Sequence, residues 1–102
     1  MPLTAVSGCV ARAGDDWILT NATARTIPAA ERTRGARQNV EWAAANNKGT
    51  ERYRLIGRPL LEEFKIEAHQ GHRIVVRGLL VSDSGEKRLN LVSLAMVGES
   101  CN

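Results

Sequence analysis

The chain has 102 residues, of which 43% are hydrophobic and 25% are charged, and its formal net charge is +3 at pH 7. This composition is typical of one small globular domain, and it excludes a second domain and disorder along the whole length. No apolar run approaches the ~20 residues that span a bilayer, so we expect no membrane insertion.

The basic excess is concentrated in the middle of the chain. Between Thr23 and Arg58, eight Arg and Lys residues against three Glu residues give a net charge of +5, which leaves −2 for the rest. Such a basic excess can bind an anionic partner. In a polar loop, the alternative is that it only keeps the loop solvated.

The N-terminal segment predicts a β-hairpin. Alternating small and β-branched residues from Leu3 to Arg12 favour a strand, and Ala13 to Asp16 supply turn residues. Trp17 to Thr20 returns as the second strand.

The region from Asn21 to Thr50 has no sustained periodicity. Pro28, Gly35 and the run from Asn46 to Gly49 interrupt it, although Ala29 to Ala45 has a composition that favours short helical turns. We expect a long, basic and mobile loop over residues 21–50.

Regular structure resumes with a third strand and a helix. Tyr53 and Leu55 alternate with polar residues between Glu51 and Gly57. Pro59 suits a first helical turn, and Gly71 is placed to end the helix, so the pattern predicts a short amphipathic helix from Pro59 to Gln70. Its apolar side, with Leu60, Leu61 and Phe64, is expected to be buried against the core.

Two further strands complete the predicted fold. His72 to Ser82 is apolar on both faces, as in a central strand, and Lys87 to Val97 follows after a turn. The element order is therefore β-β-loop-β-α-β-β, mainly β with one short helix between the third and fourth strands. We predict that residues 1–102 form a single domain, a five-stranded OB-fold-like Greek-key barrel.

Four segments carry a resemblance to a known group of proteins: Gly8-Cys9, Tyr53 to Gly57, His69 to Gly78, and Val92 to Leu94 running on to Cys101. In these segments the chain resembles small bacterial exported proteins of uncharacterised function that have an OB-like barrel and are made with a signal peptide. The resemblance implies a periplasmic or secreted protein, and we expect Met1 to replace a removed leader. It does not extend to residues 21–50, and it implies no specific activity.

Cys9 and Cys101 lie near opposite ends of the chain. Their terminal placement and the resemblance to exported proteins favour a disulfide, which would stabilise the fold by about 4 to 5 kcal/mol through the entropy of the unfolded chain. Two buried, inert thiols are the alternative.

His69 and His72 nominally complete a two-Cys, two-His zinc set with the cysteines. Structural zinc sites usually bring two cysteines from one tight turn, and no such pair occurs in the sequence. We therefore expect no metal and no cofactor, with His69 placed at the free carbonyls of a helix C-terminus.

The sequence contains no pattern typical of a catalytic site. Ser7 lies inside a predicted strand, Glu62 and Glu63 are adjacent and point to different sides of a helix, and no glycine-rich phosphate loop occurs. We expect that the protein is not an enzyme.

The predicted binding surface is the face of the second and third strands with its bordering loops, which OB-folds typically use. The candidate ligand-binding residues are Arg52, Tyr53, Arg54, Arg58 and Trp42. The leading prediction is a non-catalytic, extracytoplasmic binding or interaction module for an unidentified ligand or protein partner. The alternative is a single-stranded nucleic-acid-binding domain that uses this basic face and the loop, although two aromatic residues are few for base stacking.

Overall fold

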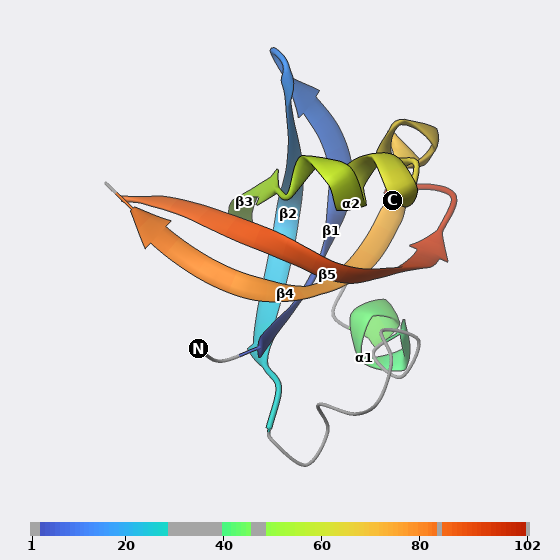
Figure 1. Cartoon of the computed structure of the whole chain (residues 1–102). Helices are drawn as coiled ribbons and strands as arrows, with labels where there is room; N and C mark the ends of the chain where they lie inside the picture. The colour runs from blue at the N-terminus through green and yellow to red at the C-terminus, as the bar shows by residue number, and fades with distance from the viewer. Residues whose placement is uncertain (1–2, 29–39, 46–48, 84, 102) are drawn as a thin grey trace.

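The computed structural model describes residues 3–28, 40–45, 49–83 and 85–101, and it shows a closed five-stranded β-barrel (Figure 1). The strands are β1 (Leu3–Ala13), β2 (Asp16–Thr26), β3 (Glu51–Ile56), β4 (Arg73–Asp83) and β5 (Glu86–Gly98). Their order around the barrel is β1-β2-β3-β5-β4, and every neighbouring pair is antiparallel except β3 and β5, which are parallel. This is an OB-fold-like barrel, and the predicted fold class is confirmed.

Strand β2 is longer than its sequence suggests. It continues to Thr26, whereas the expected loop began at Asn21. The apolar alternation is lost because the ladder with β3 shifts register between Leu19 and Ala22, where Asn21 takes a positive φ of 49°. Beyond this bulge the polar residues still pair with β1, as far as Thr26 opposite Thr4, so backbone hydrogen bonds hold a strand that periodicity does not reveal.

A helix, α1 (Val40–Ala45), also lies within the expected loop. Ala43 is fully buried in a cluster with Ala5, Ile27 and Val75, and Val40 and Trp42 pack against this cluster on the outside of the barrel. The prediction of a single continuous loop is therefore wrong for this segment. Positions 29–39 and 46–48, with Arg32, Arg34 and Arg37, lie outside the described residues. The prediction that they are mobile concerns these positions and stays a prediction.

In place of the predicted single helix, the structure has two short ones. They are α2 (Arg58–Glu63) and the 3-10 helix η3 (Ile66–His69). Gly57 precedes α2 with a φ of 97°, a conformation that suits glycine, and its carbonyl accepts hydrogen bonds from the next turn. Lys65 interrupts the path with a left-handed φ of 53°. Because of this break, Leu61 and Ile66 are buried, while Leu60 and Phe64 pack against the core only in part. The expectation that Phe64 is buried is therefore only partly correct.

The main core fills the barrel interior. Its fully buried side chains include Val6 from β1, Leu19 from β2, Val76 from β4 and Leu89 from β5. At Gly78 a Cβ atom would lie 2.4 Å from the carbonyl oxygen of Asn90, so the close approach of β4 and β5 requires glycine there.

A cysteine pair brings the segment that follows β5 next to β1. Cys9 of β1 and Cys101, which follows β5, lie at disulfide-bonding distance with their Cα atoms 5.6 Å apart. The two residues belong to segments separated by almost the whole sequence, so the bridge ties the C-terminal end of the chain to the first strand.

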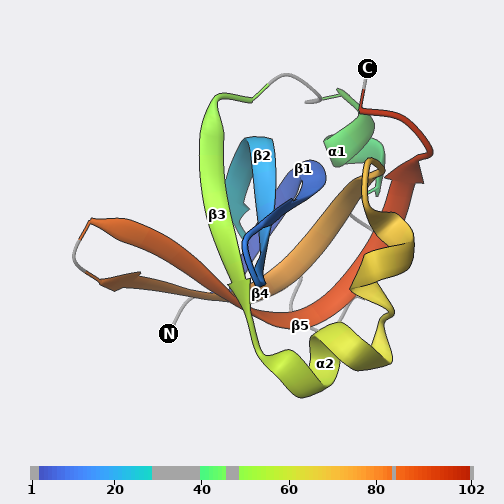
Figure 2. The same ribbon diagram turned by 90° about the horizontal axis from the view of Figure 1, so that it is seen from above.

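Figure 2 shows how the remaining elements surround the barrel. The helices α1 and α2 lie on different sides of it, and the β4–β5 hairpin projects beyond the other strands (Figures 1 and 2). None of the helices in the described residues is long and apolar enough to cross a membrane.

Candidate functional site

The predicted binding face on β2 and β3 presents fewer free groups than its sequence suggests. Arg52 is exposed and has no ion-pair partner among the described residues. Arg54 points outward too, and 37% of its side chain is exposed. Tyr53 points inward, however, with only 3% of its surface exposed. The prediction that Tyr53 belongs to the exposed face is wrong, because the alternation of β3 places it in the core.

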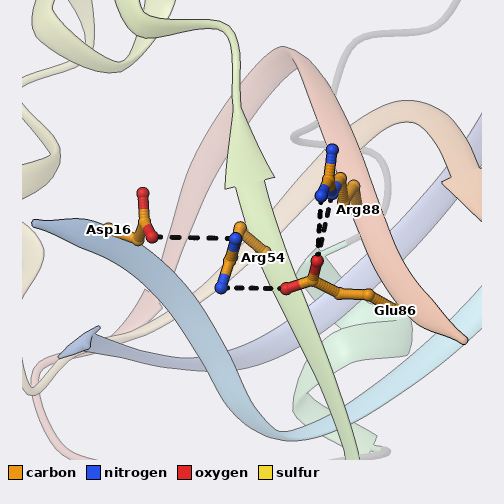
Figure 3. Close-up of polar contacts among 4 residues, drawn as sticks. All are labelled: Asp16, Arg54, Glu86 and Arg88. Carbon is orange, nitrogen blue, oxygen red and sulfur yellow. Dashed lines mark hydrogen bonds and ion pairs between the residues drawn. The ribbon is translucent and has the colours of Figure 1, made fainter. Parts of the chain in front are cut away.

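Two cations of this face, Arg54 and Arg88, are paired with neighbouring carboxylates (Figure 3). Arg54 contacts Glu86 at 2.9 Å and Asp16 at 3.7 Å. Glu86 also accepts from Arg88, with its other carboxylate oxygen 3.1 Å from the guanidinium. The network joins the start of β2, the middle of β3 and the start of β5, and it leaves little positive charge free for a phosphate chain.

A second cross-strand group surrounds Tyr53. Its hydroxyl donates to Oε2 of Glu51 at 2.7 Å, and Lys87 forms a close ion pair with the same oxygen while its ammonium lies 5.4 Å from the tyrosine ring centroid. The bonds from Lys87 and Tyr53 lower the pKa of Glu51. Burial, together with the neighbouring Glu51 carboxylate, raises the pKa of Tyr53 above its ordinary value.

The other two predicted site residues do not join this face as described. Trp42 lies in α1, whose contacts are with the outer surface of β4 and β5. Arg58 begins α2, and its side chain is outside the described part of the chain. Arg52 and Arg54 are therefore the predicted residues that the structure brings together. They line a shallow hollow of about 320 Å³ with Ile18, Glu86 and Lys87.

A larger groove of about 1080 Å³ lies between the β1–β2 turn and the α2–η3 segment. We call it the hairpin–helix groove. Its aliphatic lining is formed by Leu55, Ile56, Leu61, Ile66 and Ala68. Trp17 contributes an aromatic ring, and the guanidinium of Arg12 lies 5.5 Å from the centroid of that ring.

The charged lining of the hairpin–helix groove is mainly acidic. It has four carboxylates and two cations, which give a net charge of −2: Asp15, Asp16, Glu62, Glu67, Arg12 and Lys65. No signal in the sequence marks this site, because its residues come from the β1–β2 turn, β3 and the helical segment. In the sequence, Glu62 and Glu67 stand out only as polar residues of the predicted helix.

The two histidines lie close together at the end of η3 and the start of β4. Their rings meet edge to face with centroids 5.7 Å apart, and the backbone N–H of His72 donates to the carbonyl of His69. Burial, and then the proximity of His72, lowers the pKa of His69. Within the described ranges, no three metal-ligating side chains converge on one point.

Comparisons with known proteins give no relative from which a function can be transferred: no family model, no curated protein and no solved structure matches this chain. The resemblance to exported OB-like proteins therefore stays a prediction. Any functional assignment depends on the geometry of the barrel and its two hollows.

Proposed function

We propose that this protein is a non-catalytic binding module whose ligand occupies the hairpin–helix groove. The observation that carries the proposal is the groove itself. Its volume of about 1080 Å³ lies at the top of the range of roughly 300–1,000 Å³ that is typical of ligand pockets, whereas the 320 Å³ hollow on the strand face lies near the lower limit.

The chemistry of the lining supports this assignment. Trp17 and the aliphatic side chains supply apolar contact area, and charged groups of both signs at the rim supply orientation. Lys65, which lines the groove, holds a left-handed backbone conformation that is unfavourable for a residue with a side chain. Backbone strain of this kind is concentrated at binding sites, where the surrounding structure maintains it.

An extracytoplasmic location is part of the proposal. The disulfide-distance pair Cys9 and Cys101 is compatible with an oxidising compartment, where such bridges form and persist. The proposed module acts in that compartment by binding, because the groove combines apolar contact area with charged groups of both signs.

The proposed function can be tested without knowing the ligand. A library of small organic fragments is titrated into isotope-labelled protein, and the amide shifts are mapped onto the structure. We expect the perturbed amides to cluster around Trp17, Gly57 and Ile66. Perturbations confined to Arg52, Arg54 and Lys87 would contradict the proposal and favour the strand face, and the absence of any hit in the groove would also contradict it.

The nucleic-acid alternative predicts a different result. A single-stranded oligonucleotide should bind the cationic strand face, with an affinity that falls steeply as salt is raised. Because Arg54 and Arg88 are already paired with Glu86 and the hairpin–helix groove is acidic, we expect no saturable binding of oligothymidine at low salt. Saturable, salt-sensitive binding would contradict our ranking of the two functions.

A further inference from the structure

We infer that the ligand of the hairpin–helix groove is an extended peptide segment in which Lys or Arg side chains alternate with aliphatic ones. This inference rests on the proposed function and adds the chemical class of the ligand. It follows from the charge, the apolar lining and the aromatic ring that the groove brings together.

The first argument is charge complementarity. The carboxylates of Asp15, Glu62 and Glu67 have no ion-pair partner among the described residues, whereas Asp16 is paired with Arg54 at 3.7 Å. These three carboxylates outnumber the two lining cations, Arg12 and Lys65, so the groove keeps a net negative charge. A cationic segment is attracted to such a surface, and a phosphate chain is repelled.

The second argument is the apolar part of the lining. Leu55, Leu61 and Ile66 are buried core residues, so they fix the floor of the groove through the packing of the barrel. The apolar area open to a ligand comes from the less buried lining residues Trp17, Ile56 and Ala68. Leucine-sized side chains can bury area against them, whereas a simple polyamine has no branched apolar group to place there. The lining thus favours a peptide over a small organic cation.

The third argument is the Trp17 ring. It already lies 5.5 Å from the guanidinium carbon of Arg12, which shows that a cation is compatible with its environment. A ligand Lys or Arg can stack on an indole in the same way, and indole is the best of the aromatic rings for this contact. Trp17 also provides the fluorescence signal for an experiment, since the only other tryptophan of the sequence is Trp42 of α1.

The test measures Trp17 fluorescence in a Trp42→Phe background. The probe is an end-capped hexapeptide of alternating Lys and Leu, compared with the same peptide carrying Gln for Lys, and with spermidine. We expect the Lys–Leu peptide to bind at least about tenfold more tightly than either comparator, because it alone supplies both charge and apolar area. Its affinity should fall several-fold between 50 mM and 500 mM salt, given a Debye length of about 10 Å at 0.1 M.

Matched variants locate the effect. Glu62→Gln combined with Glu67→Gln removes two lining charges, and we expect a loss of affinity of about 4- to 25-fold, from roughly 2- to 5-fold for each exposed charge. Glu63→Gln removes an exposed charge of the same helix that does not line the groove, and it should leave the affinity unchanged. Equal losses in both variants would show that general charge attraction drives binding, and would overturn the inference.

Further outcomes separate the inference from the function on which it rests. If fragments perturb the groove but the Lys–Leu peptide does not bind, the ligand class is wrong and the binding groove stands. If spermidine or the Gln peptide binds as tightly as the Lys–Leu peptide, the ligand class is also wrong. If neither fragments nor peptides reach the groove, both proposals fail.

Discussion

The barrel interior and the outer surface beneath α1 are built from the same strands but have different compositions. On β1 and β4, Val6 and Val76 point inward and pack in an apolar core, while their neighbours Ala5 and Val75 point outward and are covered by α1. Both layers are buried. One strand therefore serves two cores, as expected when successive side chains alternate between the faces of a sheet.

The two layers differ in their polar content. The interior cluster is formed by hydrophobic residues together with Tyr53, whose hydroxyl is bonded to Glu51. On the outer surface, buried Ser7, Arg73 and Arg77 lie in the strands beside Ala5 and Val75. Burial lowers the pKa of Arg73, which shows that removing its charge from water has a cost. Because the interior cluster also contains more buried apolar side chains than the outer one, we expect the interior to contribute more to stability.

The largest expected effect concerns the bridge at the edge of the outer layer, where Cys9 lies opposite Arg73. Replacing both Cys9 and Cys101 by Ser should lower the free energy of unfolding by about 2 to 5 kcal/mol, because the unfolded chain regains the entropy that the bridge removes. Urea unfolding measures the loss, and intact mass with and without reductant confirms the bond. An unfolding midpoint that reductant leaves unchanged would contradict the bridge.

The next prediction tests the interior. Leu89 is fully buried in β5, so Leu89→Ala should destabilise the protein by about 2 to 5 kcal/mol through lost burial and the cavity left behind. Val92 of the same strand is 49% exposed, and Val92→Ala should cost less than about 0.5 kcal/mol. Similar losses for the two variants in urea would show that the inward and outward faces of β5 are assigned wrongly.

The outer layer should respond more weakly. Trp42 is half-buried against the strands, and Trp42→Ala should lower the free energy of unfolding by about 1 to 2 kcal/mol, less than for a fully buried tryptophan. Unfolding can be followed by the fluorescence of Trp17, which packs against the interior.

A companion experiment asks whether the two layers unfold together. Trp17→Phe leaves Trp42 to report on the outer layer, and Trp42→Phe leaves Trp17 to report on the interior. Because both layers share β1 and β4, the two unfolding transitions should coincide. A Trp42 transition at clearly lower urea would show that α1 detaches before the barrel opens.

The smallest predicted effect on stability comes from the ionisation of the buried Tyr53 hydroxyl, and it is absent at neutral pH. Its pKa is raised above the ordinary value of 10.0, first by burial and then by Glu51. The unfolded chain releases this proton near pH 10 and the folded chain does not, so stability is unaffected below pH 10 and declines as the pH rises above it.

This ionisation is directly measurable, because Tyr53 is the only tyrosine in the chain. The absorbance change near 295 nm should appear only well above pH 10, and in Glu51→Gln it should shift to lower pH while staying above 10, since burial remains. Titration of the native protein at an ordinary tyrosine pKa would show that Tyr53 is exposed, and that the interior is less closed than the structure indicates.

The fold was largely predictable, and the candidate site was not. The alternation in β1, β3 and β4, together with Pro59 in the first helical turn and Gly71 after the helical segment, led to the correct barrel class and to nearly correct bounds for these three strands. The same alternation, applied more strictly, would have placed Tyr53 inside, since Arg52 and Arg54 flank it. The polar half of β2 and the helix α1 were missed because their apolar residues are few and their periodicity is short.

Hydrophobic periodicity acts between near neighbours in the chain, so the order of amino acids alone predicts the alternating apolar faces of β1, β3 and β4. The contacts between distant segments follow only from the tertiary structure. Glu86 pairs with Arg54, α1 covers Val75, and Trp17 faces the helical segment across a groove. These contacts depend on the register of strands far apart in sequence and on the closure of the barrel. No local pattern of residues contains that information.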